Sequence, residues 1–152
     1  MTRENISDKF RTRYYRHGDF KEISDIWVMT GMGAPERGDD ESVVENSISM
    51  GGALIVLEDI MTGKLVGTSW MTFDGRRILL HHFGILPGYQ GNGLSKILLK
   101  ESLSFAKGKG YQVKLEVHST NIKASNLYKK FGFRRLGDYD IYIIRDISKI
   151  IQ

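Results

Sequence analysis

Ile85-Leu86-Pro87-Gly88-Tyr89-Gln90-Gly91-Asn92-Gly93-Leu94-Ser95-Lys96 is the stretch of sequence that decides the fold. The pattern predicts an apolar strand that ends at Ile85, a glycine-rich turn, and a helix that begins at Leu94. Glycines let the main chain approach an anion closely, and the free N–H groups and positive dipole at the start of a helix attract negative charge. The stretch therefore predicts a backbone cradle for the phosphates of a cofactor.

Strand and helix patterns on both sides of this turn predict an α+β fold with three layers. The expected strands are residues 11–16, 53–58, 65–73, 78–85, 111–117, 133–136 and 139–146. The expected helices are residues 20–30, 43–50, 94–107 and 122–131. A helix joins strands 78–85 and 111–117, so these two should lie parallel. We expect a mixed, mostly antiparallel central sheet of about seven strands flanked by about four helices.

Length and composition limit the class of protein. The 152 residues suit a single domain, residues 1–152. The net charge of +4 is spread over scattered basic residues, so no nucleic-acid partner is expected. Without cysteine, the chain has no thiolate nucleophile and no cysteine metal site. The start, Met1 to Asn5, has no apolar leader, and no apolar run approaches the ~20 residues of a membrane span, so we expect a cytoplasmic protein with no membrane partner.

The glycine turn differs from two common phosphate loops, because it has neither Gly-Lys-Ser/Thr nor a third glycine at the dinucleotide spacing. The segment Gln90-Gly91-Asn92-Gly93-Leu94-Ser95 instead resembles the Gln/Arg-x-x-Gly-x-Gly/Ala signature of the GCN5-related N-acetyltransferase (GNAT) superfamily. That superfamily binds the pyrophosphate of acetyl-CoA on this turn. Ser95 stands where Gly or Ala is usual, but it is also small.

A second stretch, Leu115 to Phe133, is similar to the other signature of the same superfamily and has features of its RimI-like branch. Two signatures in the right order make coincidence improbable. The resemblance implies a GNAT fold whose parallel strand pair is splayed, with acetyl-CoA as cosubstrate and no metal. The matching residues are Asn121, Ala124, Leu127, Tyr128, Gly132 and Phe133.

The resemblance also implies roles for the matched positions. Tyr128 would be the general acid, because attack of an amine on a thioester expels a thiolate that needs a proton. The alternative is a core tyrosine packed with Phe131. Asn121 either touches the cofactor or only caps its helix. The backbone of 83–85 would pair with the pantetheine arm and polarise the thioester carbonyl. Contacts with acetyl-CoA are implied for Phe83, Gly84, Ile85, Gln90, Gly91, Asn92, Gly93, Leu94, Ser95, Lys96 and Asn121.

A base should remove the proton of the attacking ammonium, and two residues compete for that role. Glu116 matches the proton acceptor of the RimI-like branch, and His81 occupies a strand position where other branches use histidine. Alternation along a strand lets only one of His81 and His82 face the substrate. Each of these residues also has a purely structural interpretation, and adjacent strand histidines without a third ligand do not favour a metal site.

The loop Pro35-Glu36-Arg37-Gly38-Asp39-Asp40-Glu41 lies where the substrate-binding helices of the superfamily begin. Its carboxylates could attract a cationic amine. The plainer interpretation is a solvated loop in which Asp39 or Asp40 caps the next helix.

The leading functional hypothesis is an N-acetyltransferase that moves an acetyl group from acetyl-CoA to a primary amine by direct attack in a ternary complex. The alternative is a non-catalytic acyl-CoA-binding regulatory module, which would lose the acid and the base. The acceptor is expected to be a small-molecule or peptide amine, and a homodimer is left open.

Overall fold

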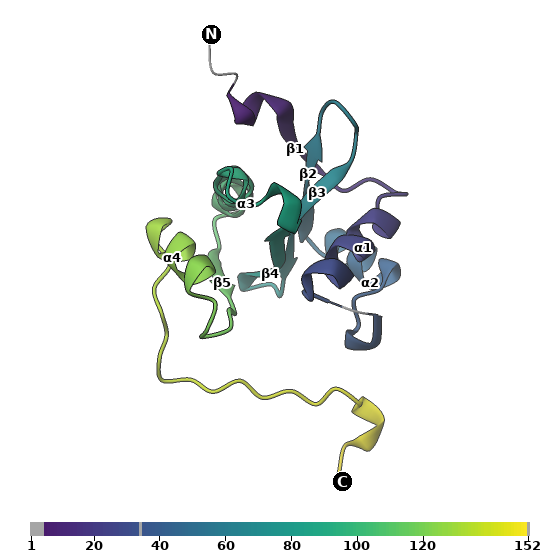
Figure 1. Cartoon of the computed structure of the whole chain (residues 1–152). Helices are drawn as coiled ribbons and strands as arrows, with labels where there is room; N and C mark the ends of the chain where they lie inside the picture. The colour runs from purple at the N-terminus through teal and green to yellow at the C-terminus, as the bar shows by residue number, and fades with distance from the viewer. Residues whose placement is uncertain (1–4, 34, 152) are drawn as a thin grey trace. The chain divides into compact units, whose positions relative to one another are not determined.

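Figure 1 shows the computed structural model of the chain, which describes residues 5–33 and 35–151. The chain divides between Glu116 and Val117 into two compact units. The expectation of a single domain stays a prediction. The start of the chain, on which the expectation of no leader rests, lies mostly outside the described residues. Within the described part, no helix is both long enough and apolar enough to cross a membrane.

The first unit is built on a five-stranded sheet. Its strands lie in sequence order, β1-β2-β3-β4-β5. The first four pair antiparallel with their neighbours, and β5 pairs parallel with β4, as expected for strands joined through a helix. The bounds are β1 (Phe10–Tyr14), β2 (Ala53–Asp59), β3 (Leu65–Phe73), β4 (Arg77–Ile85) and β5 (Gln112–Leu115).

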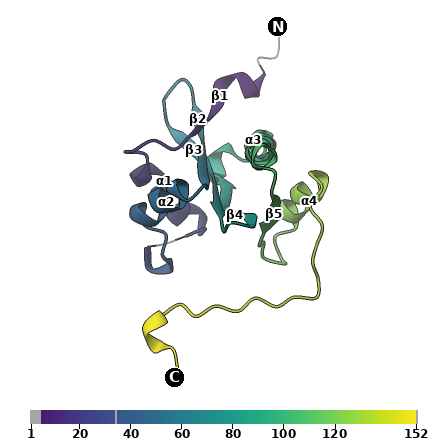
Figure 2. The same ribbon diagram turned by 180° about the vertical axis from the view of Figure 1, so that it is seen from behind.

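Helices cover both faces of this sheet (Figures 1 and 2). Helices α1 (Phe20–Thr30) and α2 (Glu41–Ser49) pack on one face, and α3 (Leu94–Lys109) packs on the other. This arrangement explains why β2 is buried along almost its whole length instead of alternating between buried and exposed residues. The fourth helix, α4 (Ile122–Lys130), belongs to the second unit, so the prediction of four α-helices is confirmed. Short 3₁₀ helices lie at Ile6–Lys9, Pro35–Arg37, Pro87–Tyr89 and Ile147–Lys149.

The prediction of seven strands is wrong, because the described residues form five. Residues 133–136 and 139–146 were expected to close the sheet, but no strand forms in either segment. Strand propensity describes how a side chain fits a pleated, paired surface and is not a property of an isolated backbone. A lone hairpin gains too little from two strands to be stable in water.

The parallel strands β4 and β5 are paired over only part of β4. Pairing runs from Arg77 opposite Gln112 to Leu80 opposite Leu115, where β5 ends. Strand β4 continues to Ile85 and leads directly into the glycine turn. The expected splay of this pair stays a prediction.

Candidate active site

The glycine turn joins the C-terminal end of β4 to the start of α3. Pro87 opens a single 3₁₀ turn, which suits its fixed φ and missing N–H. Gly91 and Gly93 follow with φ of 83° and 76°, in the left-handed region that a residue with a Cβ rarely adopts. Gly93 is the N-cap of α3 and makes no side-chain cap, so the first N–H groups of this 16-residue helix have no side-chain acceptor from the cap position.

The surface of this turn is open. No atom lies within 4 Å of the position that a Cβ would take at Gly88, Gly91 or Gly93. Gln90 stabilises the turn, because its Nε2 donates a 2.9 Å hydrogen bond to the carbonyl oxygen of Ile85. An exposed backbone at a helix N-terminus fits an anion such as a pyrophosphate. Gln90, Asn92 and Lys96 are exposed here and Ser95 is half-buried, whereas the Leu94 side chain is a core residue.

The last residues of β4 lie beneath the loop that follows α1. A Cβ at Gly84 would stand 2.7 Å from Met32 Sδ, near the far end of a flexible side chain. Phe83 and Gly84 are half-buried and Ile85 is buried. The Gly84 backbone is therefore approached closely by a flexible thioether side chain, which is easily moved.

A bulge interrupts β4 at His81 and His82, so the regular alternation on which the sequence expectation rested does not hold there. Which of the two histidines faces the substrate stays a prediction. Opposite Thr68 and Trp70 of β3, the register on β4 skips from Gly84 to His81. The extra residue takes up the left-handed conformation at His82, where φ is 42°, the only positive φ outside glycine among the described residues. Both imidazoles consequently lie against Trp70, with ring centroids 5.7 Å and 5.3 Å away.

His81 is a half-buried neutral imidazole. Burial lowers its pKa below the ordinary value near 6.5, and the neighbouring His82 lowers it further, while Glu116 and Asp39 act in the opposite direction. Its Nε2 lies 2.8 Å from Thr72 Oγ1 on β3. At neutral pH, His81 is therefore uncharged and is a weaker base than an exposed histidine.

His82 is paired with a buried carboxylate. Its Nε2 lies 3.0 Å from Asp39 Oδ2, and the two side chains are 16% and 9% exposed. The imidazole also packs against Trp27 at 4.6 Å between ring centroids. Gly33 completes the enclosure, because a Cβ there would stand 2.5 Å from His82 Nε2. The pair ties the loop after α1 to the bulge of β4.

The two aspartates of the loop do different work. Asp40 caps α2, since its side chain accepts a 2.9 Å hydrogen bond from the Val43 N–H, and that bond lowers its pKa. Its neighbour Asp39 is buried instead, so the interpretation of a wholly solvated loop is wrong. Glu116 lies just beyond β5 and is exposed. The pKa of His81 responds to both Glu116 and Asp39, so the structure brings these carboxylates to the histidine pair.

Tyr128 and Asn121 belong to the second unit. Tyr128 is 8% exposed, and its ring lies 5.6 Å from that of Phe133 in an edge-to-face contact; the sequence suggested Phe131. Burial raises the pKa of Tyr128 to about 12, so the phenol keeps its proton at neutral pH. Asn121 does cap α4, accepting a 3.2 Å hydrogen bond from the Ala124 N–H.

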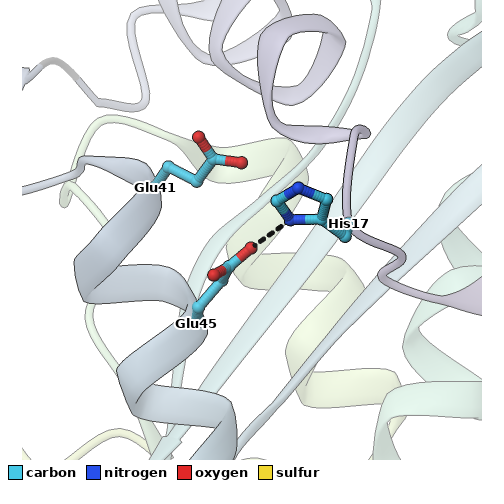
Figure 3. A group of neighbouring side chains, drawn as sticks. All are labelled: His17, Glu41 and Glu45. Atoms are coloured by element: carbon cyan, nitrogen blue, oxygen red, sulfur yellow. Dashed lines mark hydrogen bonds and ion pairs between the residues drawn. The ribbon is translucent and has the colours of Figure 1, made fainter.

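A separate cluster lies on the surface beside α2 (Figure 3). His17, Glu41 and Glu45 are the one group of three potential metal-binding side chains that the described residues bring within 4.8 Å of one another. Glu45 Oε1 already lies 3.0 Å from His17 Nδ1 and accepts a 2.9 Å bond from the Tyr15 hydroxyl. His17 and Glu45 are thus already joined by a hydrogen bond at the surface.

Sequence reasoning missed the buried pair and its aromatic enclosure. Asp39 looked like a cap, and Trp27 looked like one more residue of an amphipathic helix. Of the loop glycines, Gly33 was the available signal, because a Cβ there would meet the side chains of His82 and Asp39. The contact between Asp39 and His82, however, depends on the bulge of β4, which no local sequence pattern predicts.

Comparison with known proteins places these features in one family. The sequence profile described as "Acetyltransferase (GNAT) family" matches residues 20–133. "Acetyltransferase SG1711" from Sodalis glossinidius is 26% identical over 123 residues, which cover 80% of this chain and 84% of that protein. "N-alpha-acetyltransferase RimI" from Mycobacterium tuberculosis is 40% identical over 79 residues, 49% of either chain.

The fold is similar to that of a GNAT family acetyltransferase from Elizabethkingia anophelis, solved with acetyl-CoA bound. The TM-score is 0.62 at 16% identity, over 84% of this chain and 77% of the other. The similarity at this level of identity concerns the fold alone.

Proposed function

Because the chain belongs to the Acetyltransferase (GNAT) family, we propose that it is an acetyl-CoA-dependent N-acetyltransferase that acetylates a primary amine by direct attack in a ternary complex. The turn at Gly91–Gly93 carries the proposal. It sets an open, glycine-lined helix N-terminus at the end of β4, which runs on past its pairing with β5. Such a backbone suits the pyrophosphate, and in this proposal the pantetheine arm lies along residues 83–85 like an added strand.

In this proposal, acetyl-CoA supplies the acetyl group as a thioester. The N–H groups at the start of α3 hold the pyrophosphate, and the N–H groups of 83–85 polarise the thioester carbonyl. Tyr128 donates its phenolic proton to the departing sulfur, a role that requires the protonated form its raised pKa maintains. The proton of the ammonium goes to a base near the bulge of β4, where His81, His82 and Glu116 are the candidates.

For the acceptor, we propose a primary amine of a peptide or small molecule. The similarity to the mycobacterial N-alpha-acetyltransferase RimI supports testing peptide N-termini first, although it covers about half of each chain. The buried carboxylate and exposed acidic residues around the loop after α1 are compatible with a cationic acceptor.

The test is a panel of amine acceptors in which free CoA is titrated with a thiol reagent. The chain contains no cysteine, so every thiol detected comes from the cosubstrate. We expect release that depends on both acetyl-CoA and one class of amine, with the acetylated amine confirmed by mass spectrometry. Tight acetyl-CoA binding without transfer to any amine would instead support the alternative of a non-catalytic acyl-CoA-binding module.

A further inference from the structure

The bulge of β4 holds a histidine and a carboxylate in an arrangement that the reaction outlined above does not yet use. His82 Nε2 is fully buried and, among the described residues, has no well-aligned hydrogen bond, yet Asp39 Oδ2 lies 3.0 Å from it. The 16% exposure of the His82 side chain must therefore belong to its other atoms. One ring nitrogen is committed to a buried carboxylate, and the other is left for a second partner.

The backbone stores strain at this position. A histidine with φ of 42° inside a strand is strained, and such strain persists where the surroundings enforce it, often at functional sites. Several contacts enforce it here. Thr68 Oγ1 donates a 2.8 Å hydrogen bond to the carbonyl oxygen of His82, and the indole of Trp27 donates to the same hydroxyl.

The two other candidate bases are less well suited. Glu116 lies just beyond β5 and is exposed. Burial and the neighbouring imidazole lower the pKa of His81, and its Nε2 is already shared with Thr72. Neither residue has a buried carboxylate within ion-pair distance among the described contacts.

We propose that His82 accepts the proton of the attacking amine at Nδ1 and that Asp39 is its positioning residue, an inference that rests on the proposed acetyl transfer. The amine nitrogen forms a bond to the acetyl carbon, and the carbon–sulfur bond breaks. The ammonium loses two protons as it becomes the amide: one moves to His82 Nδ1 and the other leaves to water. The Tyr128 hydroxyl gives its proton to the departing sulfur and takes one back from water.

Asp39 has two physical effects in this scheme. Its carboxylate favours the tautomer with the proton on Nε2, which leaves the lone pair on Nδ1. When Nδ1 takes a proton, the contact becomes a charge-assisted ion pair. Among the described residues, two titratable groups lie around His82: Asp39 from the loop and His81 on the same strand. Glu116, just beyond β5, acts on the charge of His81. The neighbours of His82 from α1 and β3 carry no charge; they are Trp27, Thr68 and Trp70.

The experiment compares the full-length wild type with His82→Gln, Asp39→Asn and His81→Gln, and with His17→Gln as a matched surface control. Acetyl-CoA affinity is measured by calorimetry, turnover is measured against pH, and the His82 tautomer is read from its ring ¹⁵N shifts. We expect His82→Gln to lower kcat by about 100-fold or more with acetyl-CoA affinity within twofold of wild type. Asp39→Asn should lower kcat less, change the acidic limb of the pH profile and shift the tautomer away from Nε2–H.

The outcomes are distinguishable. If the wild type acetylates an amine and the His82→Gln variant is fully active, the assignment of His82 is overturned and the proposed function stands. Loss of the acidic limb in His81→Gln alone moves the role to His81. An Asp39→Asn variant with unchanged tautomer and pH profile removes the positioning role. A wild type that binds acetyl-CoA and acetylates nothing overturns the proposed function, even where the ¹⁵N shifts show the Nε2–H tautomer.

Discussion

The indole of Trp27 donates a 2.9 Å hydrogen bond to Thr68 Oγ1, which is completely buried between α1 and the sheet. The same hydroxyl donates a hydrogen bond of its own to the carbonyl oxygen of the bulged residue, His82. One buried side chain thus satisfies a donor on α1 and an acceptor on β4. Because it does both, this hydroxyl fixes α1 against the distorted part of the sheet.

Replacement of Thr68 by Val should therefore destabilise the fold. The valine keeps the shape but leaves the Trp27 N–H and the His82 carbonyl unsatisfied, which costs about 1–3 kcal/mol of unfolding free energy. Urea denaturation measures this loss. Thr62→Val, at an exposed turn, is the control and should stay within about 0.5 kcal/mol of wild type. Equal stability of both variants would show that the two hydrogen bonds of the Thr68 hydroxyl contribute nothing to the free energy of unfolding.

The phenol of Tyr128 should matter to turnover and not to cofactor binding. Tyr128→Phe removes the proposed donor to the sulfur, so kcat should fall by about 100-fold or more while acetyl-CoA affinity is retained. Tyr139→Phe, at an exposed tyrosine of the same unit, is the matched control. Steady-state kinetics and calorimetry measure the two quantities. Full activity of Tyr128→Phe would remove this residue from the chemistry.

The left-handed glycines of the turn should be specific for cofactor affinity. In Gly93→Ala, the new Cβ meets no neighbour, but its φ of 76° costs roughly 1–2 kcal/mol, so the turn relaxes and acetyl-CoA affinity should fall about tenfold. Gly108→Ala, within α3, also meets nothing and should stabilise the helix by about 0.5–1 kcal/mol with affinity unchanged. Equal affinities in the two variants would argue against a binding role for the turn.

His17 provides a prediction about pH. The hydrogen bond that His17 makes to the Glu45 carboxylate raises the pKa of His17 above the ordinary value near 6.5, and the negative charges of Glu45 and Glu41 raise it further. The stabilisation it brings is therefore complete below the ordinary value and is lost as pH rises through the raised one. NMR titration should show the pKa falling back in Glu45→Gln, and falling less in Glu41→Gln. An unchanged titration in Glu45→Gln would show that the pair does not form in solution.

Much of the fold was predictable because its signals are local. The glycine turn lies within a few consecutive residues, and Asp74-Gly75 is a local hairpin signal between the expected strands 65–73 and 78–85. These strands pair antiparallel, and Asp74 Oδ1 accepts hydrogen bonds from the N–H groups of Arg76 and Arg77. The parallel order of β4 and β5 then follows from chain connectivity.

The remainder depends on pairing that local sequence does not specify. Residues 139–146 have strand-forming side chains, but a strand exists only where a ladder partner is available. The side on which His82 lies depends on one extra residue in the register, and a shift of one residue reverses every side chain beyond it. Consequently, His81 could be proposed from sequence, whereas the pairing of His82 with Asp39 could not.

The unpaired segment Ile141-Tyr142-Ile143-Ile144 makes the chain prone to aggregation, because its side chains are between 63% and 89% exposed. A short β-branched and aromatic run of this kind, with neither proline nor charge, readily stacks on copies of itself. Asp140 and Arg145 flank the run and act as charged gatekeepers. Salt screens that protection, so the concentration at which light scattering detects aggregates should fall as ionic strength rises.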